Sequence, residues 1–395
     1  MYKVRTYNAI SSKGLDRLSR ECFEVSSDIN APNALLLRSY KLSDGDIGDS
    51  VSAIARAGAG VNNIPIEHCT ERGIVVFNTP GANANAVKEL VAAGMFLACR
   101  DIVGGMRFIN ELDPALSAED MGPVLEANKK QFAGSELQGK TLGVLGLGAI
   151  GSLIARLGLD LGMEVVGYDP AISVEAAWRL PSSVKKMDNM QSLFARSDYV
   201  SLHIPVLEST RGLVNADTLS YFKKDACLLN FARDQIVNTR AVVDALDKGQ
   251  LRTYVTDFPH PALRNRSDTI LMPHIGASTA EAEENCAVMA ADQIKAFLDH
   301  GNIRNSVNFP AIELERTTDS RLTVTNRNAP GTLSHILNVL GDANLNVADL
   351  LNKSRGDIAY NLIDLNSTPS PDVLDSVRAV DGVINVRYLG KPCSI

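Results

Sequence analysis

A glycine-rich motif between two short apolar runs is the feature that most constrains the fold of this chain. The run 142–145 leads into Gly146-x-Gly148-x-x-Gly151, and a helical pattern and a second apolar run, 165–167, follow. This is the order that a dinucleotide-binding βαβ unit requires. Gly146 permits a tight turn, Gly148 lets the backbone approach a pyrophosphate, and Gly151 lets the helix pack close to the strand. A lone G-x-G-x-x-G is often only a turn, but the flanking strand and helix patterns favour nucleotide binding.

An acidic residue ends the second apolar run of this unit. Asp169 stands where a carboxylate can accept hydrogen bonds from both hydroxyls of a ribose. The next residues, Pro170, Ala171 and Ile172, carry no positive charge, so a 2′-phosphate would meet repulsion. The free N–H groups and the dipole at the start of the helix favour the phosphates of the dinucleotide. The pattern therefore predicts NAD rather than NADP as the cofactor.

Size and composition limit the class of protein. A chain of 395 residues is too long for one compact core, and its 45% apolar and 22% charged residues are typical of a globular protein. The net charge of −7 argues against nucleic acid or an anionic membrane as the main partner. The six cysteines are scattered without a C-x-x-C pair, which indicates neither a disulfide framework nor a metal site. No long apolar segment suggests a signal peptide or a membrane span, so we expect a cytoplasmic protein.

Strand-like and helix-like segments alternate along most of the chain, which predicts an α/β fold with parallel sheets. Two long helices are expected, at 84–109 and 279–298. The nucleotide unit then forms a Rossmann-type, doubly wound domain at 95–286, inserted in a flavodoxin-like substrate-binding domain made of 1–94 and 287–315. Strands are expected at 3–7, 34–38, 53–56, 74–77, 199–203, 226–230, 253–256 and 269–272.

The last part of the chain, 319–395, has a different order of elements. Its pattern is β-α-β-β-α-β, which predicts a ferredoxin-like domain. The expected segments are 321–325, 331–340, 345–351, 358–364, 372–380 and 383–388. No catalytic combination of residues occurs in it. It could serve for dimerisation or for sensing a small ligand, and the two roles are compatible.

Four polar residues end or follow predicted strands, where ligands bind in open α/β sheets. His274, in MPHIGAST, suits proton transfer at a hydroxyl carbon. His203 is followed closely by a proline, which fits cofactor contact better than catalysis. Arg233 could hold a carboxylate with two parallel hydrogen bonds, although a solvated arginine is the alternative. Asp257 could hold a nicotinamide amide or orient the histidine.

Six motifs carry a resemblance that covers essentially the whole chain. They are RAGAGVNNIP (56–65), NTPGANANAVKEL (78–90), GLGAIG (146–151), NFARD (230–234), VTDF (255–258) and PHIGAST (273–279). The chain resembles the D-isomer-specific 2-hydroxyacid dehydrogenases, in the form that carries a C-terminal ACT domain at 319–395. The resemblance implies NAD-dependent oxidation of 3-phospho-D-glycerate to 3-phosphohydroxypyruvate, the first step of L-serine biosynthesis. Two alternatives stay open: a dehydrogenase for another D-2-hydroxy acid, and a non-enzymatic NAD(H)-sensing protein.

The resemblance also implies roles for individual residues. Arg233 would bind the substrate carboxylate, and His274 would be the general acid and base. The residues implied for NAD binding are Gly146, Gly148, Ile150, Gly151, Asp169, His203, Pro205, Thr210, Ala232, Asp257 and Gly276. Those implied for binding the phosphorylated substrate are Arg38, Arg56, Gly58, Ala59, Gly60 and Asn83. In the ACT domain, L-serine would be held between two copies, in a homodimer or homotetramer, by Asn326, Asn328 and Asn346.

Two positions depart from the family pattern. The family usually carries D-x-F-x-x-E-P, whose glutamate pairs with the catalytic histidine, but residues 257–262 here read DFPHPA. His260 falls roughly where that glutamate would be, so either another carboxylate replaces it or the catalytic histidine is unpaired. Asp234 stands where the family usually has glycine, which changes the local turn preference because Asp tolerates positive φ less readily.

Overall fold

The computed structural model describes residues 1–393, apart from the side chain of Glu175. The chain divides into two compact units. The first unit consists of residues 1–83 and 279–395, and the second of residues 84–278. Within the described part of the chain, none of the helices combines the length and the apolar character that crossing a membrane requires.

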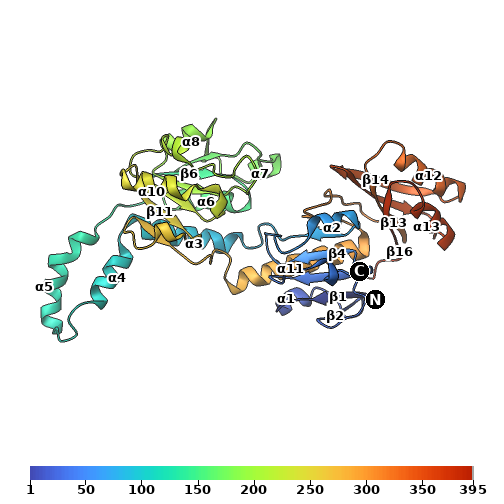
Figure 1. The fold of residues 1–395 in the computed structure, drawn as a ribbon, viewed down its shortest axis with the longest axis horizontal. Coiled ribbons are helices and arrows are strands. Elements are labelled where there is room, and N and C mark those ends of the chain that lie inside the picture. Colours follow the sequence, from blue (N-terminus) through green and yellow to red (C-terminus); the bar gives the residue numbers. More distant parts are fainter. Residues whose placement is uncertain (394–395) are drawn as a thin grey trace. The chain divides into compact units, whose positions relative to one another are not determined.

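The second unit is built on a seven-stranded parallel sheet (Figure 1). Its strand order is β12-β11-β10-β9-β6-β7-β8, so the order reverses between β9 and β6. The predicted Rossmann-type fold is confirmed, and the reversal is the place where such sheets bind ligands. Every residue of β10 is buried, as expected for a parallel strand covered on both faces. The strands are β6 (Thr141–Leu145), β7 (Glu164–Tyr168), β8 (Lys185–Lys186), β9 (Tyr199–Leu202), β10 (Ala226–Asn230), β11 (Leu251–Thr256) and β12 (Thr269–Leu271).

The helices of this unit correct one expectation. A single helix over 84–109 is wrong, because α3 ends at Cys99 and a new helix starts at Ile102. Asp101 lies between them, and its side chain accepts a hydrogen bond from the Gly104 amide at 2.8 Å. This N-cap starts a new helix at a point where the apolar pattern of the sequence would have continued the first one. The helices are α3 (Ala84–Cys99), α4 (Ile102–Asn110), α5 (Ala118–Asn128), α6 (Ala149–Asp160), α7 (Val174–Trp178), α8 (Met190–Arg196), α9 (Ala216–Leu219) and α10 (Thr239–Asp247), with short 3-10 turns η2 (Lys129–Phe132), η3 (Asp234–Ile236) and η4 (Pro261–Leu263).

Helices α4 and α5 contain no buried residue. They stand away from the rest of the second unit in Figure 1. Four large apolar side chains of α4 are exposed: Ile102, Val103, Met106 and Ile109. We call these two helices the arm.

The first unit contains a five-stranded parallel sheet with the order β2-β1-β3-β4-β5. This is the flavodoxin-like order that the sequence predicts. Helix α11 (Ala280–His300) packs on the sheet, and its buried face shares a core with β1, β3, β4 and β5. The other elements are β1 (Tyr2–Thr6), α1 (Ser12–Leu15), β2 (Phe23–Ser26), β3 (Ala34–Leu37), η1 (Asp44–Asp46), β4 (Ala53–Arg56), α2 (Ile66–Glu71) and β5 (Val75–Phe77).

The C-terminal part of the first unit forms a four-stranded antiparallel sheet, β14-β15-β13-β16, with the predicted βαββαβ order. Strand β15 is buried along its whole length. Its Ile363 packs with helices α12 and α13, whereas Tyr360 lies in the same core as Phe297 and Phe309, so both faces of the strand are covered. The elements are β13 (Ser320–Arg327), α12 (Thr332–Asp342), β14 (Val347–Arg355), β15 (Ile358–Leu365), α13 (Pro371–Arg378) and β16 (Val383–Leu389).

A buried ion pair and a disulfide are among the links between side chains of the first unit. Arg321 and Asp364 form a fully buried ion pair, with Nε–Oδ1 at 2.5 Å and Nη2–Oδ2 at 2.9 Å. A disulfide joins Cys22 to Cys393 across 371 positions of the sequence. The cysteine spacing suggested no disulfide framework and did not indicate this bond, because the two residues come together only in the folded chain.

Candidate active site

The glycine-rich loop has the geometry that its sequence predicts. Gly146 has φ of 90°, and a Cβ atom there would collide with the carbonyl of His203. A Cβ atom at Gly151 would collide with the carbonyl of Gly146, so the helix could not pack as closely. Gly148 is the N-cap of α6, and a Cβ atom there would meet nothing within 4 Å. The backbone at Gly148 is therefore open to a phosphate at the start of a helix.

Asp169 follows β7, and two backbone amides fix its carboxylate. Its Oδ2 accepts from the Leu147 amide at 2.8 Å, and its Oδ1 accepts from the Ala171 amide at 2.9 Å. The acidic side chain is thus tied to the glycine-rich loop itself. Together with the open backbone at Gly148, this fits a dinucleotide whose ribose hydroxyls donate to a fixed carboxylate.

The segment after β9 is held by its own side chains. His203 Nε2 lies 2.8 Å from Ser201 Oγ, while His203 Nδ1 is buried without a hydrogen-bond partner. Burial of the ring lowers the pKa of His203 to about 3, so the imidazole is neutral near pH 7. Thr210 Oγ1 donates to the Pro205 carbonyl at 2.7 Å and accepts from the Leu207 amide at 2.7 Å. A neutral histidine with a free ring nitrogen fits a cofactor contact rather than proton transfer.

Arg233 follows β10 on a short loop that Asn230 fixes. The fully buried Asn230 donates from Nδ2 to the Arg233 carbonyl at 2.9 Å and accepts from the Ala232 amide at 3.2 Å. The Arg233 side chain is exposed, and its Nη1 donates to the Ala232 carbonyl at 2.6 Å. Asp234 begins η3 and does not have positive φ, so the glycine usual in the family is not needed for this turn.

Asp257 follows β11 and organises the loop after β12. Its carbonyl accepts from the His274 amide at 2.8 Å, and its Oδ2 accepts from the Gly276 amide at 3.0 Å. These bonds hold His274 at φ of 47°, an uncommon left-handed conformation of the kind that clusters at functional sites. Burial raises the pKa of Asp257, and the Gly276 amide and the charges of His274 and Arg233 oppose the rise. Asp257 Oδ1 is buried without a partner, so it can accept from a nicotinamide amide.

Within residues 1–393, no carboxylate forms a hydrogen bond or an ion pair with the ring of His274. No hydrogen bond joins this ring to any residue within 1–393, and the Phe258 ring lies 4.7 Å away, centroid to centroid. His260 does not take the place of the family's glutamate as a hydrogen-bond partner. Instead it caps η4, and its Nδ1 accepts from the Ala262 amide at 3.2 Å.

The substrate residues implied by the resemblance lie in the first unit. Arg56 Nε donates to the Arg38 carbonyl at 2.9 Å, and its Nη1 donates to the Gly60 carbonyl. This guanidinium therefore shapes the turn that contains Gly58 and Ala59. Arg38 Nη2 lies 2.6 Å from the Glu283 carboxylate, and both side chains are exposed. An anion at Arg38 would compete with this ion pair.

The three asparagines of the C-terminal domain differ in exposure. Asn326 is buried, and its amide donates to the Arg327 carbonyl at 2.6 Å and accepts from Asn361 at 2.7 Å. Asn328 and Asn346 are exposed. Asn328 Nδ2 donates to the Gly356 carbonyl at 3.2 Å, at the protein surface, whereas the hydrogen bonds of Asn326 lie in the protein interior.

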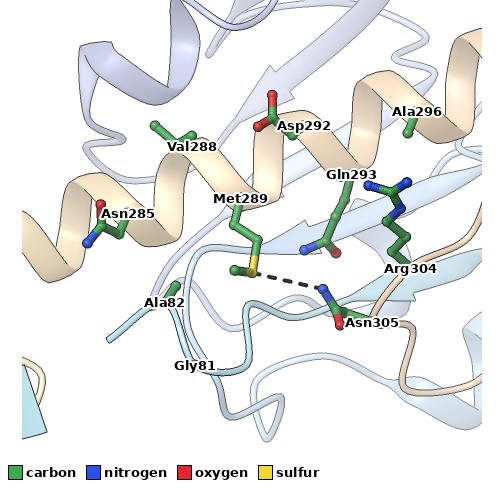
Figure 2. A pocket seen from close by; sticks show the side chains of 10 residues that line it. All are labelled: Gly81, Ala82, Asn285, Val288, Met289, Asp292, Gln293, Ala296, Arg304 and Asn305. Carbon is green, nitrogen blue, oxygen red and sulfur yellow. Dashed lines mark hydrogen bonds between the residues drawn. The ribbon is translucent and has the colours of Figure 1, made fainter. Parts of the chain in front are cut away.

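A pocket of about 540 Å³ opens in the first unit, between α11 and the segments at 81–82 and 304–305 (Figure 2). Gln293 points into this space from α11, with its Nε2 donating to the Asn78 carbonyl at 3.1 Å and its Oε1 buried without a partner. None of the residues predicted for substrate or cofactor binding lines it.

Comparisons with known proteins agree with the fold and the loop geometry. Residues 101–276 match the family model described as D-isomer specific 2-hydroxyacid dehydrogenase, NAD binding domain. D-3-phosphoglycerate dehydrogenase of Haemophilus influenzae is 34% identical over 84% of this chain and 79% of its own length. Hydroxypyruvate reductase of Thermotoga maritima is 32% identical over 74% of this chain and 97% of its own length.

Some relatives are much longer. The chain spans only 55% of the D-3-phosphoglycerate dehydrogenase of Methanocaldococcus jannaschii. Among solved structures, the NAD⁺-bound 3-phosphoglycerate dehydrogenase of Entamoeba histolytica has a TM-score of 0.61 and 25% identity, and the match covers 79% of this chain and 99% of that one. With its NAD-binding domain and its similarity to these relatives, the chain belongs to the family of D-isomer specific 2-hydroxyacid dehydrogenases.

Proposed function

We propose that this protein oxidises 3-phospho-D-glycerate to 3-phosphohydroxypyruvate with NAD, the first step of L-serine biosynthesis. The observation that carries the proposal is the arrangement of Arg233, Asp257 and His274 after three adjacent strands, β10, β11 and β12. They share one sheet with the glycine-rich loop and Asp169. The names of relatives at about a third sequence identity support this choice of substrate.

Each of the three residues has a distinct task in the proposed reaction. Arg233 binds the substrate carboxylate with two parallel hydrogen bonds, which positions C2 and its hydroxyl. His274 takes the hydroxyl proton on its imidazole as general base. Asp257 holds the His274 backbone through its carbonyl and fixes the following turn through its carboxylate. Bound NAD supplies the acceptor for the hydride that leaves C2.

The experiment is NADH formation with 3-phosphoglycerate, compared with glycerate, lactate and no substrate. We expect the highest kcat/KM with 3-phosphoglycerate, because Arg38 offers a cation for the phosphate once its pair with Glu283 opens. As a matched control, Arg38→Ala should reduce the advantage over glycerate and leave the rate with glycerate nearly unchanged. Equal kcat/KM values for the phosphorylated and unphosphorylated acids would contradict the assignment.

A second candidate is a dehydrogenase or reductase for another D-2-hydroxy acid. The similarity to a hydroxypyruvate reductase over 97% of that protein favours it. The contacts of the two predicted phosphate ligands also favour this candidate. Arg56 forms hydrogen bonds with the carbonyls of Arg38 and Gly60, and Arg38 forms an ion pair with Glu283. The same assay separates the candidates, and a non-enzymatic NAD(H) sensor would show dinucleotide binding without turnover of any of these acids.

We also propose that the C-terminal βαββαβ domain is an ACT regulatory domain that binds L-serine. Asn328 and Asn346 would provide the contacts, because their amides are exposed and can both donate and accept. Asn326 would support the serine site indirectly, because its side-chain oxygen already accepts a hydrogen bond from Asn361 in the protein interior. Calorimetry with serine on the wild type and on Asn346→Ala tests this, and an absence of binding at millimolar serine would leave the domain a structural role.

We propose a homodimer or homotetramer as the working state. Strands β14 and β16 lie at the edges of the C-terminal sheet, where a second copy can pair. The exposed apolar side chains of the arm offer a second contact surface. Light scattering on the wild type and on Met106→Glu would reveal a change of mass if the arm contributes.

A further inference from the structure

The only disulfide within residues 1–393 joins a buried cysteine to an exposed one. Cys22 is 2% exposed and lies just before β2, where its amide donates to the Ser19 carbonyl and its carbonyl accepts from the Tyr2 amide. Cys393 follows β16 and is exposed. The bond therefore joins the segment after β16 to the start of β2, and it links a buried residue to an exposed one.

The bond is the main attachment of the segment that follows β16. The last residue of β16, Leu389, accepts a hydrogen bond from Arg316 at 3.1 Å through its carbonyl. Beyond this strand, Cys393 Sγ lies 3.9 Å from the Glu21 carbonyl. The sheet itself is held by other contacts. Arg387 lies over the Phe297 ring at 4.2 Å, and the Tyr360 hydroxyl donates to the Gly301 carbonyl at 2.9 Å. Opening the disulfide would thus free residues 390–393 without undocking the sheet.

The remaining cysteines cannot compete in this chemistry. Cys69, Cys99, Cys227 and Cys286 are buried and have no disulfide partner. Burial raises the pKa of Cys69 to about 11 and that of Cys227 to about 12. Because the thiolate is the reactive form, the thiols of Cys69 and Cys227 are poor nucleophiles near pH 7.

We propose that Cys22–Cys393 is a thiol–disulfide exchange site that responds to thiols of the glutathione class. A glutathione thiolate attacks Cys393 Sγ, the Cys22–Cys393 bond breaks, and Cys22 leaves as a thiolate that takes up a proton. A second glutathione thiolate then attacks the glutathione sulfur of this mixed disulfide, and Cys393 leaves as a thiolate that takes up a proton, which yields two protein thiols and one glutathione disulfide. In the reverse direction, glutathione disulfide accepts the two electrons and the bond forms again. The switch releases or fastens residues 390–393.

Peptide mapping tests the bond directly. Trypsin cuts after Arg20, Arg38 and Arg387 but not at Lys391–Pro392, so the oxidised chain should yield peptide 21–38 linked to peptide 388–395. The folded protein is equilibrated with mixtures of glutathione and its disulfide, quenched by alkylation and digested. We expect the linked pair of peptides to disappear in excess glutathione and to return in excess glutathione disulfide. No linked pair in excess glutathione disulfide, or a pair that millimolar glutathione leaves intact, would overturn the proposal.

Two further readouts use the folded protein. Without denaturant, the reduced protein should react with a maleimide at Cys393 alone, and the oxidised protein should not react. Carboxypeptidase should trim past residue 393 at least about tenfold faster in the reduced protein, because an unattached chain end is cleaved more readily. In the Cys393→Ser variant, the rate of carboxypeptidase cleavage past residue 393 should no longer depend on glutathione. In the Cys69→Ala variant, that rate should still depend on glutathione as in the wild type. Equal trimming of oxidised and reduced wild type would contradict release of the segment.

Discussion

The carboxylate of Asp169 allows a quantitative test of cofactor choice. We consider Asp169→Asn, which removes the charge and keeps one oxygen that can accept from the Leu147 or the Ala171 amide. The variant therefore preserves much of the link between β7 and the glycine-rich loop. A change in cofactor preference can then be attributed to charge rather than to a collapsed loop.

The magnitude follows from the charges. Two unit charges 4 Å apart repel by about 1 kcal/mol in water and by about 4 kcal/mol at an effective dielectric constant of 20. Asp169 is only half-buried, so the lower part of this range applies. Removing one charge should favour NADP relative to NAD by about 5-fold at least, and by up to about 1000-fold if the site excludes water. Loss of the stronger acceptor for the ribose should weaken NAD binding as well.

The assay measures kcat/KM for both dinucleotides with 3-phosphoglycerate, and their binding to the enzyme without substrate. Asp217→Asn is the control, because Asp217 is an exposed carboxylate at the first turn of α9 in the same unit. It should leave the NAD/NADP ratio unchanged. Equal use of both dinucleotides by the wild type, or an unchanged ratio in a folded Asp169→Asn protein, would refute the electrostatic argument.

Substitutions at three other residues test the site and the fold. His274→Ala should lower kcat by about two to four powers of ten with NAD binding retained, measured by steady-state kinetics and dinucleotide titration, and a near-normal kcat would exclude it as general base. Arg233→Ala should mainly raise KM. Arg233→Lys should bring KM only part of the way back, because an ammonium group cannot form the two parallel hydrogen bonds that a planar guanidinium makes with a carboxylate. Asp364→Ala should destabilise the protein by about 3–5 kcal/mol in denaturant titrations, because Arg321 stays buried without a counterion. Burial alone would raise the pKa of Asp364, but the bonds from Arg321 and Thr317 outweigh it and lower the pKa. The stabilisation is therefore complete above the ordinary Asp value of about 3.9 and is lost as the pH falls through the lowered pKa, an acid sensitivity that Asp364→Ala should lack.

Much of the fold could be predicted because local pattern and global architecture agree. The three glycines at 146–151 each meet a steric requirement that the structure contains, and Asp169 closes the same unit. The parallel arrangement of both sheets follows from the alternation of apolar segments with helical ones, although β2 and β8 were not expected from the sequence. The long helix at 84–109 was wrong because one capping side chain, Asp101, interrupts a continuous apolar period.

The rest depends on contacts between distant residues. The bond between Cys22 and Cys393 spans nearly the whole sequence, and no local pattern indicates it. In the sequence, Arg56 and Asn326 look like ligand contacts. In the folded chain their side chains already form hydrogen bonds with Gly60 and Asn361, and the sequence alone does not reveal these partners. The roles of the individual site residues remain predictions until the substitutions above are measured.

The covered sheet of the C-terminal domain bears on how this chain can be shortened or recombined. Tyr360 and Leu362 on one side, and Phe297 and Phe309 on the other, belong to a single core. A truncation before β13 would leave these aromatic rings of the remaining protein in water, and a graft of the domain onto another dehydrogenase would lack their complement. Removing the C-terminal domain would therefore also remove part of the core of the first unit.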